Sequence, residues 1–471
     1  MQGGWRRFGV GCGLAILLAV ALSAQTFTSL ASFAGSNGSG PLFMSLAQAT
    51  DGNFYGTTAT GGANGWGTIF QMTPSGTLTT LHNFDVTDGE YPYAGLTLAT
   101  NGNLYGTTLG GGAFYGTIYQ ITTTGMFTTL HSFSATDGAD PYGGVTQGAN
   151  GNLFGTTFYG GASTACSDGC GTIFSLSPTG TLTTVRNLAL KNGSGPASGL
   201  TLGADGNFYG TTYDGGTSQA CFSGCGTVYK VTPAGALTVL ANFDSTNGAN
   251  PHAALVQDQT GSFYGTTANG GTGSCLPPGC GTVFKVTPAG VLTTLYNFCS
   301  QPNCSDGDSP YSPLILATDG NFYGTTVHGG AYYGTIYKIT ASGTLTVLHN
   351  FASSDGAYPY GGLVEGTDGN LYGSTFYGGA NYGTVFKLSI GLSPFVELLP
   401  VTSPVGAPVS ILGTNLSGAT SVTFHGTAAI FTIASPTLIT TTVPVGATTG
   451  KIQVVTPGGT LSSNVAFRVL P

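Results

Sequence analysis

The octet DGNFYGTT at residues 51–58 occurs seven times along the chain, intact or with small changes. Successive copies lie 49 to 59 residues apart, and a period near fifty is typical of one blade of a β-propeller. One such unit cannot bury its hydrophobic face alone, so neighbouring units have to stack. The repeat therefore constrains the fold of most of the chain. Its copies begin at Asp51, Asn101, Asn150, Asp205, Thr260, Asp319 and Asp368.

Each repeat contains four strand-like runs separated by turns. In the first repeat these runs are residues 41–50, 54–60, 68–73 and 77–84. The Asp-Gly-Asn and Pro-Ser-Gly segments between them supply the backbone angles that tight hairpins need. The sequence thus predicts one antiparallel four-stranded sheet per repeat. The aspartate of the octet is interpreted as a turn residue rather than as a catalytic or calcium-binding group.

The two ends of the repeat array complement each other. The last repeat stops after its third strand, at Thr384–Ser389, whereas Phe27–Phe33 precedes the first repeat and matches the fourth-strand pattern of Leu78–Phe84. We predict that this N-terminal strand completes the last sheet and closes the ring, which removes two free sheet edges. A β-solenoid is the alternative for a glycine-rich repeat, but it needs no permuted strand. The predicted fold is all-β, with a seven-bladed β-propeller over residues 25–390.

The N-terminus has the pattern of an export signal. Arg6 and Arg7 precede an apolar run at Leu14–Leu22, and Ser23-Ala24 provides small residues for cleavage. A membrane anchor is the alternative, but the run is shorter than the roughly 20 residues that a spanning helix needs. We expect residues 1–24 to be a signal peptide and the protein to be extracellular, cell-surface or periplasmic, with no membrane span after cleavage.

Cysteine usage agrees with export. Eight of the nine cysteines remain once Cys12 leaves with the signal, and they form four local pairs. An oxidising compartment favours four short-range disulfides, although neighbouring loops could exchange partners. Zinc is disfavoured because no histidine clusters beside the pairs, so we expect no metal and no other cofactor. The pairs are Cys166 and Cys170, Cys221 and Cys225, Cys275 and Cys280, and Cys299 and Cys304.

Charged residues are scarce. Asp, Glu, Lys and Arg together make up 6% of the chain, and the formal net charge is −8. Neither a basic stripe nor a run of like charge is present, which excludes nucleic acid as an expected partner. We expect a monomer.

Beyond about Pro394 the octet disappears and the composition changes. Apolar and polar residues alternate between glycine-rich turns, which predicts a small immunoglobulin-like β-sandwich over residues 391–471. No catalytic arrangement is visible there, and we interpret His425 as a surface strand residue.

The repeats resemble a known family. The octet, followed by GG, GTIF, a TP-x-G turn, LHNF and PY, resembles the bacterial GloVer tandem repeat of choice-of-anchor proteins over about Phe27 to Leu388. That resemblance implies export and a surface or extracellular role, without an assigned activity. The C-terminal segment resembles the IPT/TIG immunoglobulin-like domain through Ile411–Thr427 and Val443–Gly459, which implies a spacer or contact module.

One face of the predicted propeller concentrates unusual residues. The connections from second to third strand and from one blade to the next emerge on it, and both the cysteine pairs and many aromatic residues lie in them. Exposed aromatic rings on rigid loops suit sugar rings or peptide segments, and the alternative is that they pack against neighbouring loops. The candidate binding residues are Trp66, Tyr93, Tyr115, Tyr142, Tyr311, Tyr333, Tyr360 and Tyr382.

Support for catalysis is weaker. Glu365 lies on a predicted channel-lining strand where other repeats have Gln or Leu, and Asp308 lies in a loop of the aromatic face. His82, His131 and His349 recur at one fourth-strand position, where we expect surface residues and not ligands. The favoured hypothesis is a non-catalytic module that binds a glycan or a protein. The alternative is a hydrolase or lyase that acts on polysaccharides.

Overall fold

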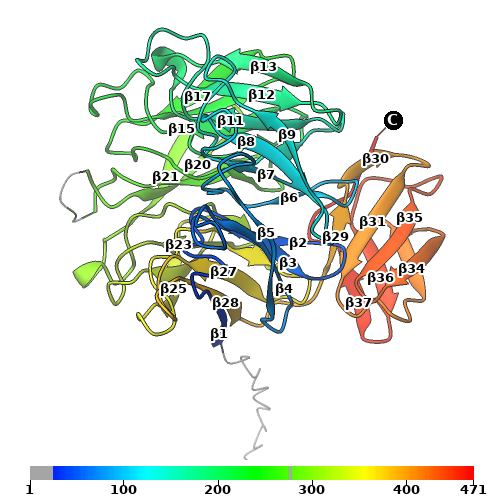
Figure 1. Ribbon diagram of the computed structural model, residues 1–471. Coiled ribbons are helices and arrows are strands. Elements are labelled where there is room, and N and C mark those ends of the chain that lie inside the picture. The colour runs from blue at the N-terminus through cyan, green and yellow to red at the C-terminus, as the bar shows by residue number, and fades with distance from the viewer. Residues whose placement is uncertain (1–24, 274, 276–277, 471) are drawn as a thin grey trace, which may run out of the picture.

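The computed structural model describes residues 25–273, 275 and 278–470, which are almost entirely β-structure. The predicted signal peptide lies outside the described residues. The repeats form propeller-like four-stranded sheets, and a separate strand-rich domain follows them (Figure 1). Two short 3-10 turns, η1 (Leu190–Asn192) and η2 (Pro302–Cys304), lie in loops between sheets.

Seven sheets arise from the repeats, and we number them I to VII in chain order. Sheet I contains β2 (Ala47–Gln48), β3 (Phe54–Thr58), β4 (Thr68–Met72) and β5 (Leu78–Asn83). Sheet II contains β6 (Thr97–Leu98), β7 (Leu104–Thr108), β8 (Thr117–Ile121) and β9 (Phe127–Ser132). Sheet III contains β10 (Thr146–Gln147), β11 (Leu153–Thr157), β12 (Thr172–Leu176) and β13 (Leu182–Asn187). Sheet IV contains β14 (Thr201–Leu202), β15 (Phe208–Thr212), β16 (Thr227–Val231) and β17 (Leu237–Asn242).

The remaining three sheets follow the same plan. Sheet V contains β18 (Val256–Gln257), β19 (Phe263–Thr267), β20 (Thr282–Val286) and β21 (Leu292–Asn297). Sheet VI contains β22 (Ile315–Leu316), β23 (Phe322–Thr326), β24 (Thr335–Ile339) and β25 (Leu345–Asn350). Sheet VII contains β26 (Val364–Glu365), β27 (Leu371–Thr375), β28 (Thr384–Ser389) and the N-terminal strand β1 (Thr26–Ser32).

The first strand of each repeat is shorter than the sequence indicates. The pattern predicts one strand over residues 41–50, but only Ala47–Gln48 pair in the sheet. In the other six repeats the preceding backbone instead accepts a hydrogen bond from a threonine side chain of the neighbouring sheet. Thr57 Oγ1 donates to the carbonyl of Ala94 at 2.9 Å, and Thr156 Oγ1 donates to that of Ser198 at 2.8 Å.

The octet makes a side-chain-stabilised turn, as predicted. The carboxylate of Asp51 accepts hydrogen bonds from the backbone and side-chain nitrogens of Asn53, at 3.1 and 2.8 Å, and from the Tyr55 hydroxyl at 2.7 Å. Gly52 has a φ of 81°, which suits glycine at this turn. Desolvation and the bond to Asp51 raise the pKa of Tyr55.

A buried threonine pair joins the second and third strands of every sheet. In sheet I the Oγ1 atoms of Thr58 and Thr68 lie 2.9 Å apart, and the same pair recurs in all seven sheets at 2.7–2.9 Å. In six sheets the third-strand hydroxyl also donates to a carbonyl of the incoming loop, at 3.1–3.4 Å. These contacts explain the threonines of the GTT and GTIF motifs.

The N-terminal strand pairs with the last sheet, as predicted. β1 runs antiparallel to β28, from Thr26 opposite Ser389 to Ser32 opposite Thr384. Phe27 stacks on His349 at a centroid distance of 3.9 Å and packs on the rings of sheet VI and VII residues. A segment from the start of the chain therefore supplies the outer strand of the final sheet.

Apolar side chains pack between successive sheets. Each of seven hydrophobic clusters unites two neighbouring sheets, and one of them joins Tyr372 and Val385 of sheet VII to Phe54 and Phe70 of sheet I. The core is thus a series of interfaces between sheets rather than one central mass.

The repeated histidines are not simple surface residues, which corrects that expectation. The side chains of His82, His131 and His349 are only 17–21% exposed. His82 Nε2 lies 2.8 Å from Asp88 Oδ2, and its ring stacks on Phe127 of the next sheet at 3.9 Å. Each of the three histidines bonds to an aspartate six residues later, so the histidines belong to the packing between sheets.

The C-terminal domain contains two four-stranded sheets and a two-stranded parallel pair. Val396, Ile411, Phe424, Ile452 and similar residues form its buried core. One sheet contains β29 (Val396–Leu399), β31 (Pro408–Gly413), β35 (Leu438–Thr442) and β34 (Phe431–Ser435), and β30 (Thr402–Pro404) pairs with β38 (Arg468–Leu470). The other sheet contains β33 (Thr427–Ala428), β32 (Ser421–Phe424), β36 (Ile452–Thr456) and β37 (Gly459–Ser462).

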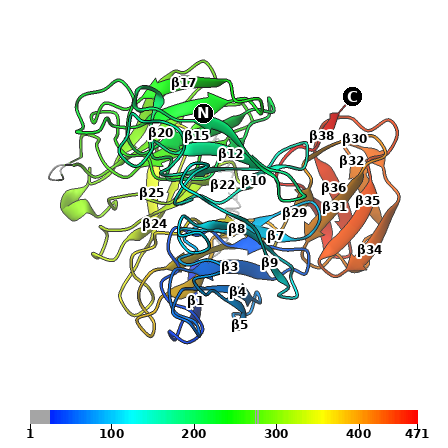
Figure 2. The same ribbon diagram turned by 45° about the horizontal axis from the view of Figure 1, so that its top comes forward.

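This domain contacts the hairpin ends of the repeats. Thr437 Oγ1 donates to the carbonyl of Thr50 in sheet I at 2.9 Å, and the Thr414 and Thr367 hydroxyls lie 2.8 Å apart. Arg468 also donates to the carbonyl of Ala204 in sheet IV. Both views show the domain on one side of the repeat region (Figures 1 and 2). The opposite face, formed by the long loops, does not take part in these contacts.

Deletion of residues 25–33 is expected to destabilise the protein strongly. It leaves β28 with an unpaired edge and removes Phe27 and Phe33 from two inter-sheet clusters. Loss of the buried Phe33, the partly buried Phe27 and a whole outer strand predicts a fall in melting temperature of at least about 10 °C, measured by differential scanning calorimetry. A peptide of residues 25–34 should restore the melting temperature, and the same peptide with Ser at both Phe positions should not. A deletion variant as stable as the full chain would contradict this account.

Candidate functional site

A turn that recurs in all seven repeats aims one side chain at the centre of the loop face. The residue before the loop proline has a left-handed backbone, with φ of 53–60°. Its N–H donates to the carbonyl that precedes the third-strand glycine, at 2.8–3.1 Å. Tyr358, for example, donates to Tyr333 at 2.9 Å. The proline and the residue after it then enter the innermost segment of the sheet.

Six rings, one from each of six of these loops, meet and form what we call the axial cluster. Centroid distances are 6.0 Å for Tyr93 and Tyr142, and 5.7 Å for Tyr311 and Tyr360. Phe43 lies 4.4 Å from His252 and 5.4 Å from Tyr360, and His252 lies 5.4 Å from Tyr311. The structure thus brings together four of the eight predicted binding residues. The axial cluster consists of Phe43, Tyr93, Tyr142, His252, Tyr311 and Tyr360.

A cavity of about 210 Å³ adjoins the axial cluster. Phe43, Tyr142, His252 and Tyr311 line it together with small residues such as Gly143. The remaining wall comes mainly from Gly, Ala and Ser of the inner segments. Small side chains leave this space open, whereas the rings border it.

The axial cluster is electrically neutral near pH 7. Desolvation raises the pKa values of its four tyrosines and lowers the pKa of His252 to about 4. The histidine is therefore uncharged under ordinary conditions, and the tyrosine hydroxyls keep their protons. Such a surface offers flat apolar area with polar edges, which suits a neutral ligand.

The other four predicted residues share one position in their repeats, and this position differs from that of the clustered tyrosines. Trp66, Tyr115, Tyr333 and Tyr382 directly precede the third-strand glycine, where sheets III, IV and V have Cys170, Cys225 and Cys280. Trp66 contacts Tyr91 edge-on at 5.5 Å, and Tyr333 contacts Tyr358 at 6.1 Å. Tyr115 and Tyr382 remain 40% and 43% exposed. This position braces the loops and lies outside the axial cluster.

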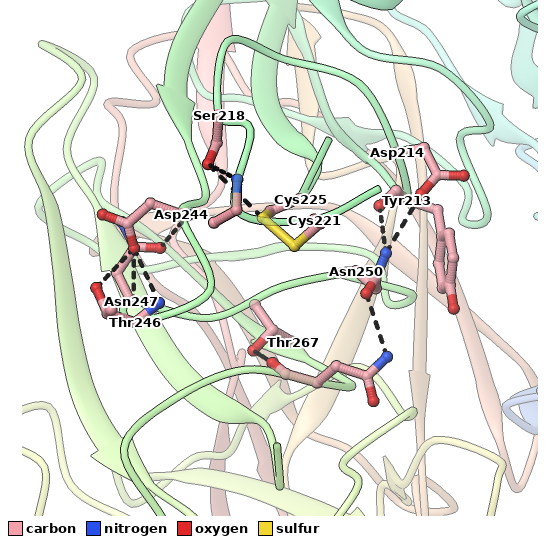
Figure 3. The surroundings of a disulfide bond; sticks show 12 residues. Tyr213, Asp214, Ser218, Cys221, Cys225, Asp244, Thr246, Asn247, Asn250 and Thr267 are labelled. Carbon is pink, nitrogen blue, oxygen red and sulfur yellow. Dashed lines mark hydrogen bonds between the residues drawn. A yellow bond between two sulfur atoms is a disulfide. The ribbon is translucent and has the colours of Figure 1, made fainter. Parts of the chain in front are cut away.

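All four disulfides are local, as the sequence predicts. They join Cys166 to Cys170, Cys221 to Cys225, Cys275 to Cys280 and Cys299 to Cys304. Figure 3 shows the second of them near the loop of Asn250, whose N–H donates to the carbonyl of Cys225 at 2.9 Å. Three sulfur atoms of the last two disulfides lie within 4.8 Å of one another, but disulfide sulfurs are not thiolate ligands.

Glu365 forms hydrogen bonds between two sheets, at the end where the hairpins lie. Its carboxylate accepts hydrogen bonds from the backbone and hydroxyl of Thr318, at 2.9 and 2.5 Å. Gln48 and Gln147 make the equivalent backbone contact with a neighbouring sheet at 2.9 Å. Desolvation raises the pKa of Glu365, although the bonds from Thr318 oppose this. Glu365 therefore joins sheet VII to sheet VI.

Asp308 lies on the loop face, where its backbone forms a two-way bridge with His328 at 3.0 and 3.2 Å. The structure thus places the two weak catalytic candidates on opposite ends of the sheets. They do not form a carboxylate pair.

Three residues of this face were not predicted from the sequence. His252 occupies the position of the clustered tyrosines, so alignment of the repeats could have identified it. Phe43 comes one residue later in its own repeat, and no sequence signal indicates its position. Asp214 is half-buried, and desolvation raises its pKa to about 6.

The fold and this face define a class: propeller-like repeat proteins with an appended immunoglobulin-like domain. The chain belongs to the family described as the Gloeobacter/Verrucomicrobia repeat, whose model matches residues 7–222, 114–326 and 217–428. Residues 395–469 match the IPT/TIG domain. Both resemblances drawn from the sequence are confirmed. No curated protein matches the chain.

Solved structures resemble the chain at low sequence identity. The extracellular domain of a protein described as a hybrid two-component system from B. thetaiotaomicron has a TM-score of 0.51 at 11% identity, covering 94% of this chain and 54% of that chain. The chain thus spans about half the length of that structure. A structural genomics protein of unknown function from Bacteroides thetaiotaomicron has a TM-score of 0.42 at 14% identity, covering 78% of this chain and 76% of its own. Within the described part of the chain, no helix has the length and apolarity to cross a membrane.

The substitution His252→Tyr is expected to reduce acid sensitivity. Because folding lowers the pKa of His252 from 6.5 to about 4, the unfolded chain binds more protons between these pH values. The histidine's contribution is complete above pH 6.5 and is lost as the pH falls toward 4. Urea unfolding should show the variant's advantage growing by up to about 3 kcal/mol over this interval. Parallel pH profiles for the two proteins would contradict the assigned burial.

Glu365→Gln is expected to preserve the fold. Gln48, Gln147 and Gln257 make the same contact, and the raised pKa of Glu365 means that its charged form is disfavoured by folding. The variant should be slightly more stable than the wild type near pH 7, and the difference should disappear near pH 3, where the Glu365 carboxyl is protonated in both the folded and the unfolded chain. Denaturant unfolding at the two pH values tests this. A large loss of stability would refute the proposed equivalence.

Proposed function

We propose that the protein is exported and that its long-loop face binds a glycan or another protein without catalysis. In this proposal residues 1–24 are the signal peptide, residues 25–390 form a closed seven-bladed propeller, and residues 391–471 form a spacer. The observation that carries it is the neutral axial cluster at a cavity, on the face away from the C-terminal domain.

Ring closure is supported by two independent contacts between the ends of the repeat array. β1 completes sheet VII, and the cluster around Phe54 and Tyr372 packs sheet VII against sheet I. With both contacts in place, the first and last sheets lie side by side, as a closed propeller requires.

Export is supported by the four disulfides of the loop face. Disulfides persist in oxidising compartments and are rare in the reducing cytosol. The protein is then an extracellular, cell-surface or periplasmic module, and we expect it to act as a monomer.

Binding is favoured over catalysis because the acidic candidates do not cooperate. Glu365 is engaged by Thr318 and belongs to the hairpin side, whereas Asp308 lies on the loop face. The alternative, a hydrolase or lyase acting on polysaccharides, draws on Asp140 and Asp214, whose pKa values are raised by desolvation on the loop face. Product analysis distinguishes the two, since only the alternative predicts new reducing ends or unsaturated products.

Replacement of Tyr93, Tyr142 and Tyr360 by Ala is expected to weaken ligand retention at least tenfold. Each substitution removes a ring of the axial cluster, and Tyr142 also lines the cavity. The test is a glycan array and a pull-down from extracellular proteins with residues 25–471, followed by affinity measurement on each hit. The matched control replaces the same tyrosines by Phe, which keeps the rings and should retain most of the affinity. Equal retention by the Ala and wild-type proteins would refute a role for the axial cluster.

A further inference from the structure

A second cavity lies on the loop face, away from the axial cluster. It has a volume of about 390 Å³, and loops of sheets IV and V border it. Its lining includes Asp214, Phe222, Ser245 and Asn250, together with Cys221 of the Cys221–Cys225 disulfide. This size is in the range of small-ligand sites in proteins.

Phe222 is exposed on a loop that a disulfide closes. Its exposed fraction is 107%, the highest of the large hydrophobic residues in the described part of the chain. The loop around it is closed by the Cys221–Cys225 disulfide, and Gly215 donates to the carbonyl of Ser223 at 2.7 Å. A fully exposed ring beside a cavity provides flat apolar area for stacking, and the disulfide restricts the backbone that carries this ring.

Asp214 is fixed beside the same cavity. Its backbone forms a two-way bridge with Ser194 at 2.9 and 3.0 Å. The Asn250 amide donates to the carbonyl of Tyr213 at 3.0 Å and to Asp214 Oδ1 at 3.4 Å (Figure 3). Asn250 Oδ1 in turn accepts a hydrogen bond from Asn269 at 3.2 Å. Both the nitrogen and the oxygen of the Asn250 side-chain amide are thus hydrogen-bonded, whereas Asp214 Oδ2 has no hydrogen-bond partner among the described residues.

The charge around this cavity restricts the ligand. Among the described residues that line it, Asp214 alone is charged, and its carboxylate is negative when ionised. Anionic ligands are therefore repelled. A ligand that offers hydroxyl donors to a carboxylate and a flat C–H face to an aromatic ring fits this arrangement.

We propose that the cavity bordered by Asp214 and Phe222 binds a neutral saccharide, with a sugar hydroxyl donating to Asp214 and the sugar ring stacking on Phe222. This assignment rests on the proposed binding function and selects its glycan branch. It adds a second binding position to the loop face, besides the axial cluster. It also gives the Cys221–Cys225 disulfide a role in binding, because this disulfide keeps Phe222 in place.

The experiment titrates residues 25–471 with the neutral hexasaccharides of cellulose, mannan and xylan and with the anionic hexamer of galacturonic acid, by isothermal titration calorimetry. We expect at least one neutral hexasaccharide to bind and the galacturonate to bind at least tenfold more weakly. Asp214→Asn and Phe222→Ala should each lower the affinity for the neutral ligand about tenfold or more.

Matched controls keep the result specific. Phe114→Ala removes a ring that is 80% exposed in the corresponding loop of sheet II, and Asp168→Asn removes a nearby exposed charge. Both variants should bind like the wild type, and all four should have unchanged melting temperatures. Neutral binding that survives both Asp214→Asn and Phe222→Ala would overturn this site but leave the proposed binding function standing. Failure of every neutral hexasaccharide, or tighter binding of the galacturonate, would overturn the saccharide assignment, and the protein pull-down would then decide the wider proposal.

Discussion

The buried threonine pair at the loop end of each sheet is the contact on which the loop face depends. Its hydroxyls bond to each other across the second and third strands, and in six sheets one of them also holds the incoming loop by a backbone carbonyl. A buried hydroxyl without a partner costs about 1–3 kcal/mol, so the loop, the pair and the hairpin stabilise one another. The loop fixed in this way continues into the left-handed residue and the proline that direct a ring toward the axis.

Local chemistry explains what the sequence predicted well. The Asp-Gly-Asn turn, the four-strand unit and the short disulfides each depend on residues close together in the chain, and the N-terminal strand was identifiable because it repeats the pattern of Leu78–Phe84. The site was only half predictable. In the sequence, Tyr93 and Trp66 are both aromatic loop residues. Whether such a residue lies in the axial cluster depends on backbone geometry, which composition does not reveal. The innermost strands were overestimated for a similar reason, since side chains of another sheet bond their backbone.

The loops before the third strand are stabilised in two chemically different ways. Sheets I, II, VI and VII place an aromatic residue at the position where sheets III, IV and V place a disulfide-bonded cysteine. An aromatic residue stabilises by burying its ring against a neighbour, as Trp66 does on Tyr91. A disulfide needs no such neighbour, so its loop is free to present other side chains outward, as the loop with Phe222 does.

The pairing of the N-terminal strand β1 with β28 also determines the order of events in folding. Thr26 pairs with Ser389, so this contact spans nearly the whole repeat array and has to wait until the last sheet has been synthesised. Contacts between such distant residues slow folding, because a long loop must close before they form. The earlier sheets can stack as they appear, but the complete loop face exists only once the two ends meet. A chain that stops short of sheet VII would therefore leave β1 without its partner strand, and the exposed edges of β1 would be free to pair with other chains.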